Sequence, residues 1–109
     1  MPTPLYDTLT QFAGQNPLRM AMPGHKGKGI LGLPVEYARL DFTELPPTGN
    51  LYGEEWDCIA QAEQAWAEAW GADSCLFLTG GSTQGVHTML LFSDSDTILI
   101  DRVSHRSIH

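Results

Sequence analysis

Apolar residues recur at helical spacing in two parts of the chain. Leu5, Leu9 and Phe12 lie four and three residues apart, which puts them on one face and predicts a short helix over residues 4–14. Residues 54–70 have a broader apolar face with polar residues opposite, which predicts a second, longer helix. That apolar face consists of Trp56, Ile59, Ala60, Ala62, Trp66, Ala69 and Trp70.

The longer helix has end residues of the kind that helix ends favour. Glu54 and Glu55 suit the positive end of the helix dipole, and Gly71 is expected to end the helix in the left-handed conformation. The three tryptophans carry too much apolar area to leave in water. They pack either against the chain's own core or against a second subunit, and the sequence leaves both arrangements open.

Two near-continuous apolar runs, residues 75–79 and 97–100, are typical of strands that helices bury on both faces. A helix over about residues 83–92 lies between them, so the sequence predicts a β-α-β arrangement and an α/β fold. In such folds ligands bind beyond the carboxyl ends of the strands. The loops that follow Thr79 and Ile100 are therefore expected on one edge of the sheet.

The first of these loops contains Gly80, Gly81, Ser82 and Thr83 and opens the predicted helix. Glycine permits positive φ and close approach to a ligand, and the first helical N–H groups have no intrahelical partner. With the helix dipole and two hydroxyls, the turn suits a phosphate. The alternative is an ordinary helix start with Ser82 or Thr83 as the N-cap. The chain has neither a Walker nor a Rossmann glycine pattern.

Histidine and lysine residues in loops are further candidates for a site. His105 follows the second predicted strand and is expected on the same edge as the glycine turn, although a lone histidine is usually structural. Residues 20–29 combine glycines and a proline with His25, Lys26 and Lys28. Such a loop either approaches a ligand closely or is simply solvated.

Two carboxylates, Asp41 and Glu44, lie in a second irregular stretch, residues 41–53. Acid–base catalysis is open to them in principle. At a spacing of three residues in a loop, turn formation and capping are the commoner roles.

Composition limits the classes of partner. The net charge of −7 and only six Lys and Arg residues argue against a nucleic-acid surface. No apolar run approaches the roughly 20 residues that a membrane span needs, and the N-terminus does not resemble a secretory signal. Cys58, Cys75 and the four histidines fit no metal spacing, so we expect no metal site and reduced thiols in a cytoplasmic protein.

Several motifs occur in an order that resembles a known family. Taken together they are similar to the N-terminal part of the large domain of prokaryotic Orn/Lys/Arg decarboxylases, which are fold-type-I pyridoxal-phosphate (PLP) enzymes with an aspartate aminotransferase-like large domain. The resemblance covers almost the whole chain. The motifs are PLYDTL near the start, MPGHKG at 22–27, DFTELPPTGNLYG at 41–53, WGA at 70–72, FLTGGSTQG at 77–85 and ILIDRVSHRS at 98–107.

The resemblance implies roles for particular residues. Gly81, Ser82 and Thr83 would hold the phosphate of PLP, and His105 would stack on the pyridine ring. Departures at Val103, where asparagine is common in the family, and at Arg106, where lysine is common, touch none of these residues.

The loop from Pro23 to Lys26 resembles an early loop of the family that lies near the active site, which makes His25 and Lys26 possible active-site residues. The family's Schiff-base lysine and the aspartate that binds the pyridine nitrogen belong to later motifs. The resemblance therefore gives no Schiff-base role to Lys26, and this stretch alone is expected to be inactive.

The resemblance also implies an organisation and an activity. Residues 1–53 would form an N-terminal arm with loops, and residues 54–109 would begin the PLP-binding domain, truncated after the second strand of its main sheet. The implied reaction is decarboxylation of lysine, arginine or ornithine by a homodimer or larger homo-oligomer. The alternatives are a non-catalytic remnant or phosphate-binding α/β module, or another aminotransferase-like PLP enzyme.

Overall fold

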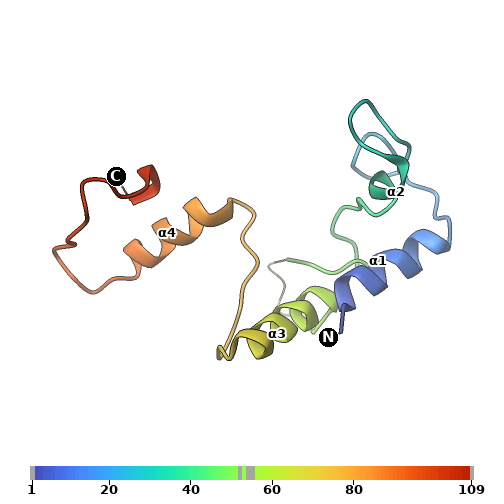
Figure 1. The fold of residues 1–109 in the computed structure, drawn as a ribbon. Helices are drawn as coiled ribbons and strands as arrows, with labels where there is room; N and C mark the ends of the chain where they lie inside the picture. The colour runs from blue at the N-terminus through green and yellow to red at the C-terminus, as the bar shows by residue number, and fades with distance from the viewer. Residues whose placement is uncertain (1, 52, 54–55, 109) are drawn as a thin grey trace. The chain divides into compact units, whose positions relative to one another are not determined.

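The computed structural model describes residues 2–51, 53 and 56–108, and the chain divides into two compact units, Met1–Cys75 and Leu76–His109. No helix in these described residues is long and apolar enough to cross a membrane. The first unit contains helices α1 (Pro4–Gly14), α2 (Val35–Ala38) and α3 (Cys58–Trp70), and the second contains α4 (Gly81–Leu91) and the 3-10 helix η1 (Arg106–Ile108) (Figure 1).

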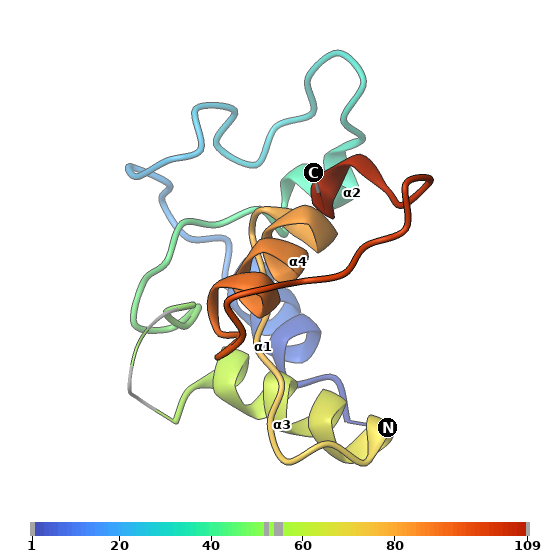
Figure 2. The ribbon, with the colours of Figure 1, turned by 90° about the vertical axis from the view of Figure 1, so that its left-hand side faces the viewer.

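In the first unit α1 packs against α3, and the two helices lie close to each other in both views (Figures 1 and 2). Both helices were predicted from their apolar spacing, and both are confirmed. The buried residues are mostly small, so the two backbones approach closely but remove little apolar area from water. The buried apolar residues are Ala13, Ala38, Cys58, Ile59, Ala62, Ala65 and Ala67.

Helix α3 begins four residues later than the apolar pattern indicates, because Asp57 is its N-cap. The Asp57 carboxylate accepts hydrogen bonds from the backbone N–H groups of Ile59 (2.8 Å) and Ala60 (3.0 Å). It also accepts one from Asn50 (2.6 Å), which ties the preceding turn to the helix. The predicted contribution of Glu54 and Glu55 lies outside the described residues.

The C-terminal end of α3 is as predicted, since Gly71 has a left-handed conformation with φ of 65°. The tryptophans do not join the buried residues. Trp66 and Trp70 stack on each other with ring centroids 6.5 Å apart, and Trp70 remains 77% exposed. Trp56 is also exposed. Packing against the chain's own core is therefore not what this structure shows, and packing against a second subunit stays a prediction.

The second unit contains the predicted helix but not the predicted strands. Helix α4 begins at Gly81, two residues before the expected start. Within the described residues, 75–79 and 97–100 form no strand, and Leu76 and Leu99 are exposed. A strand exists only when its backbone pairs with a neighbour, and the described elements of this unit are helices, which offer no strand edge. The β-α-β arrangement and an α/β sheet that stops after its second strand are therefore not confirmed.

The cap at Asp57 gives a test of how α3 is held. Burial raises the pKa of Asp57, but the hydrogen bonds from Asn50, Ala60 and Ile59 together lower it by more, so the net pKa lies below its usual value. A lowered carboxyl pKa stabilises the fold above the unfolded value of about 3.9, and this stabilisation is lost as pH falls through the folded value.

We expect the helical circular dichroism signal of the protein to fall below about pH 4 more steeply than that of the Asp57→Asn variant, because asparagine caps without titrating. Asp57→Ala should lower the signal already at neutral pH, since a lost cap costs about 1 kcal/mol. Asp73→Asn, an exposed position beyond α3, is the matched control and should follow the unmodified protein. Identical acid profiles for the protein and Asp57→Asn would contradict the role of Asp57.

Candidate functional site

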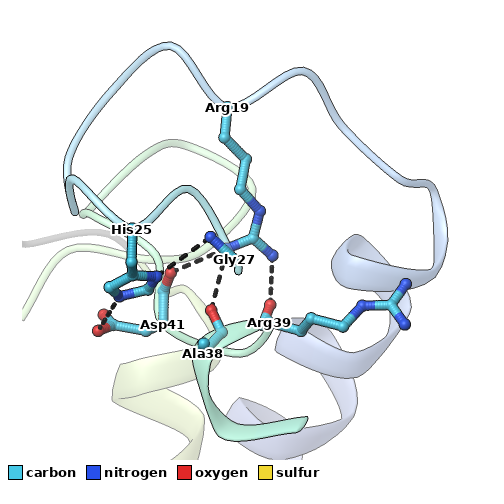
Figure 3. A network of polar contacts seen from close by, with 6 residues as sticks. All are labelled: Arg19, His25, Gly27, Ala38, Arg39 and Asp41. Atoms are coloured by element: carbon cyan, nitrogen blue, oxygen red, sulfur yellow. Dashed lines mark hydrogen bonds and ion pairs between the residues drawn. The ribbon is translucent and has the colours of Figure 1, made fainter. Parts of the chain in front are cut away.

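Arg19 is the centre of a polar network in the first unit (Figure 3). Its guanidinium donates to the backbone carbonyl oxygens of Ala38 (3.3 Å) and Asp41 (3.1 Å) and also to that of Arg39. The same group lies over the Phe42 ring, 3.8 Å from its centroid, in a cation–π contact. Arg19 therefore joins the segment after α1 to the segment after α2.

The carbonyls that Arg19 binds lie at and just beyond the end of α2, where a helix leaves carbonyl groups without intrahelical partners. A guanidinium has five N–H donors in a planar fork, so one side chain satisfies several such acceptors. Partial burial lowers the pKa of Arg19 and nearby Arg39 lowers it further, while Asp41 opposes the change. Burial is the largest of these causes.

His25 lies beside this network, and its side chain is only 8% exposed. The Nδ1 atom accepts a hydrogen bond from the Gly27 N–H at 3.1 Å, so the proton of a neutral ring is on Nε2. The Nε2 atom lies 3.1 Å from Asp41 Oδ2 and donates to it (Figure 3). His25 thus joins its own loop to Asp41 and holds the two segments together.

Lys26 and Gly27 form the sharp turn of the same loop, and both have positive φ, 53° and 75°. The Lys26 ammonium donates to the carbonyl oxygens of Met20 (3.3 Å) and Ala21 (2.5 Å), so it closes the loop on itself. A Cβ atom on Gly27 would lie 2.7 Å from Arg19 Cζ, so the guanidinium would have to shift. Glycine at this position therefore lets the guanidinium reach its carbonyls.

The predicted phosphate turn lies in the second unit, at the start of α4. Gly80 is the N-cap, and no side chain caps the helix; the Gly80 N–H itself donates to Gln84 Oε1 at 2.7 Å. Ser82 and Thr83 are exposed and lie inside the first helical turn, so neither is the N-cap of the alternative interpretation. Gly81 has φ of 67° with open space around its Cβ position. The chemistry of this turn fits a phosphate group.

His105 lies in the same unit, directly before η1, and η1 packs against α4. Its Nδ1 atom lies 2.9 Å from the Ser107 hydroxyl and accepts from the Ser107 N–H at 3.2 Å. The Asp101 carboxylate accepts from the Val103 N–H at 2.9 Å and helps to shape the preceding turn. The imidazole is exposed, so its ring is accessible to a flat ligand.

The predicted site residues thus fall into two groups. His25 and Lys26 belong to the first unit, and the Gly81 turn and His105 to the second. Glu44 forms a turn contact, accepting from the Leu51 N–H at 2.8 Å. Among the residues that the structure describes, no group of three or more His, Cys, Asp or Glu side chains is placed to hold a metal ion.

Arg19 was not singled out in the sequence. Its acceptors are backbone carbonyls, which carry no side-chain signature. The available signal was a lone arginine among apolar residues just before a loop rich in glycine and proline.

The contrast between two glycines tests the Arg19 network. Gly27→Ala should speed hydrogen exchange of the Lys28 amide, which donates to His25 O, by about fivefold or more. A fivefold change corresponds to about 1 kcal/mol of lost local stability, since about 1.4 kcal/mol is tenfold. Gly32→Ala is the matched control, since Gly32 also has positive φ (83°) but a Cβ there meets nothing within 4 Å. Equal exchange in the two variants would show that Arg19 does not depend on Gly27.

Comparisons with known proteins cover nearly the whole chain. Residues 3–109 match the family described as Orn/Lys/Arg decarboxylase, major domain. A Bacillus subtilis protein named arginine decarboxylase is 33% identical over 97% of this chain and 23% of its own length. A Bacillus cereus protein of the same name is 29% identical over 97% of this chain and 25% of its own. The uncharacterised protein YaaO of Bacillus subtilis is 30% identical over 99% and 24%.

The chain therefore spans about a quarter of the length of the curated relatives that it matches. No solved structure matches it. The family match over almost the entire sequence includes the glycine turn, His105 and the loop that carries His25 and Lys26. This chain belongs to the Orn/Lys/Arg decarboxylase family, in the part that corresponds to the major domain.

Proposed function

We propose that this chain provides the cofactor-phosphate turn and the ring-stacking histidine of a PLP-dependent decarboxylase of basic amino acids. The observation that carries the proposal is the start of α4, where no side chain caps the helix and the Ser82 and Thr83 hydroxyls are exposed. Membership of the family supports the same assignment.

The residues of the turn have the chemistry that a phosphate needs. The N–H groups of the first turn and the positive end of the helix dipole attract an anion, and two hydroxyls add donors. Gly81, at φ of 67°, is in a conformation that L side chains rarely adopt, so the turn depends on glycine for its shape. We assign phosphate binding to Gly81, Ser82 and Thr83.

His105 is assigned to the flat face of the cofactor ring. The contacts of its Nδ1 atom with Ser107 fix the tautomer and limit rotation of the imidazole. An imidazole held in this way can stack on an aromatic ring without further reordering. When bound, PLP supplies the electron sink that decarboxylation of an amino acid requires.

The proposed substrate is a basic amino acid, and arginine is the first to test because two of the relatives above are named arginine decarboxylase. The proposed setting is a cytoplasmic homodimer or larger homo-oligomer, with the exposed Trp56 and Trp70 as residues that a second subunit would cover. Lys26 receives no covalent role, since its ammonium binds the carbonyls of Met20 and Ala21. The 109 residues by themselves are therefore expected to show no decarboxylation with added PLP.

A phosphate-binding module without catalysis is the second candidate. The same turn favours it, because an uncapped helix start with two hydroxyls suits any phosphate ester. The two candidates differ in whether the chain supports turnover when it is joined to the rest of a decarboxylase.

A segment exchange separates these candidates. The matching quarter of the Bacillus subtilis relative is replaced by this chain, and release of CO₂ from arginine is measured with added PLP. Turnover supports the enzyme function. A chimera that has the helical content and oligomeric state of its parent and binds PLP, but releases no CO₂, would favour the module.

Ser82→Ala combined with Thr83→Ala should weaken PLP binding by the chimera about tenfold or more, because two hydrogen bonds to a charged group contribute about 1.5–3 kcal/mol each. Thr88→Ala, an exposed threonine further along α4, is the matched control and should leave the affinity unchanged. Equal PLP affinity in the double variant and the control would remove the phosphate role from this turn.

A further inference from the structure

Four basic side chains line one hollow on the first unit, although the chain has only six Lys and Arg residues and a net charge of −7. The hollow has a volume of about 460 Å³ and also includes Asn16. The four basic residues are Arg19, Lys26, Lys28 and Arg39. Like charges repel, so four basic side chains stay close together only when the fold holds them there.

Three separate segments bring these residues together. Arg19 follows α1, Lys26 and Lys28 flank the positive-φ turn at Gly27, and Arg39 is the C-cap of α2. Figure 3 shows the side chain of Arg39 extending away from the carbonyls that Arg19 binds. The hydrogen bonds of Arg19 and Lys26 to backbone carbonyls hold these segments in place, so the cluster is part of the folded unit.

The positive charges are not balanced by carboxylates. Across the described residues, the single ion pair joins His25 to Asp41, and none of the four basic side chains has a carboxylate oxygen within 4.0 Å. Lys28 and Arg39 are exposed, and they add positive charge to the hollow besides that of Arg19 and Lys26.

We propose that this hollow binds a small phosphate-bearing anion, at a site separate from the Gly81 turn. Arginine presents a fork of N–H donors that matches two oxygens of a phosphate, and lysine contributes a point charge with rotatable donors. Positive charge brought to one hollow from three segments suits the multiple negative charge of a phosphate better than the single charge of a carboxylate. The volume leaves room for a substituent beyond one phosphate group.

Lys28 and Arg39 are the residues to change, because the hydrogen bonds that hold the loop use the side chains of Arg19 and Lys26 instead. Pyrophosphate is the probe, with inorganic phosphate as the smaller comparison. Amide chemical shifts of the isotopically labelled 109-residue protein locate binding, and titration gives the dissociation constant.

Pyrophosphate should bind saturably, shift the amides of Lys28 and Arg39, and bind more weakly as salt is added. Lys28→Gln with Arg39→Gln should weaken binding about tenfold or more, since both charge-assisted contacts are lost. Arg102→Gln, which removes one positive charge from a residue that does not line the hollow, should leave the affinity within about twofold. The affinity is taken from the Lys28 and Arg39 amides, and any shifts at the Gly81 turn are fitted separately, so this test and that of the proposed cofactor site fail independently.

Three results would overturn the proposal. They are the absence of saturable binding, an unchanged affinity in the Lys28 and Arg39 double variant, and shifts confined to the turn at Gly81. If the double variant loses its dispersed amide spectrum, the single Arg39→Gln variant takes its place, with an expected loss of about threefold to tenfold.

Discussion

The first unit depends most on the hydrogen bonds that the Arg19 guanidinium donates to backbone carbonyls. Among the described residues between α1 and α3, the short helix α2 is the only helix, and the buried apolar side chains are mostly alanine. Apolar burial alone is therefore a weak constraint on these loops. Arg19 satisfies carbonyls that α2 leaves unpaired and stacks on Phe42. It also holds the segment that contains Asp41, whose carboxylate pairs with His25. An unmade bond to a buried carbonyl would cost about 1–3 kcal/mol.

The two proposed anion sites draw on different sources of positive charge. In the first unit Arg19 and Lys26 use their charges on backbone carbonyls, which leaves Lys28 and Arg39 to extend the positive hollow. In the second unit the attraction for an anion arises from the backbone of α4 and two hydroxyls, without a basic side chain in the turn. An acidic chain can therefore bind phosphate through local geometry despite its net charge.

Helices were the part of the fold that the sequence predicted well, because their periodicity is local. The spacing of Leu5, Leu9 and Phe12 and the glycine at position 71 correspond to α1 and the end of α3. The start of α3 was placed too early, since a side-chain cap overrides the apolar pattern. Strands at 75–79 and 97–100 were not found in the described residues, because a strand requires a partner that its own residues do not specify. The Arg19 network was not predicted for a similar reason, because backbone carbonyl acceptors are not specified by any side chain in the sequence.

The central claim is that the start of α4 holds the cofactor phosphate. The most direct test is hydrogen exchange of the Gly81, Ser82 and Thr83 amides in the chimera with the Bacillus subtilis relative, with and without PLP. These amides lack intrahelical acceptors, so a bound phosphate should slow their exchange by about tenfold or more, while amides in the middle of α3 change little. Unchanged exchange in this turn at saturating PLP, with slowing elsewhere in the protein, would contradict the account.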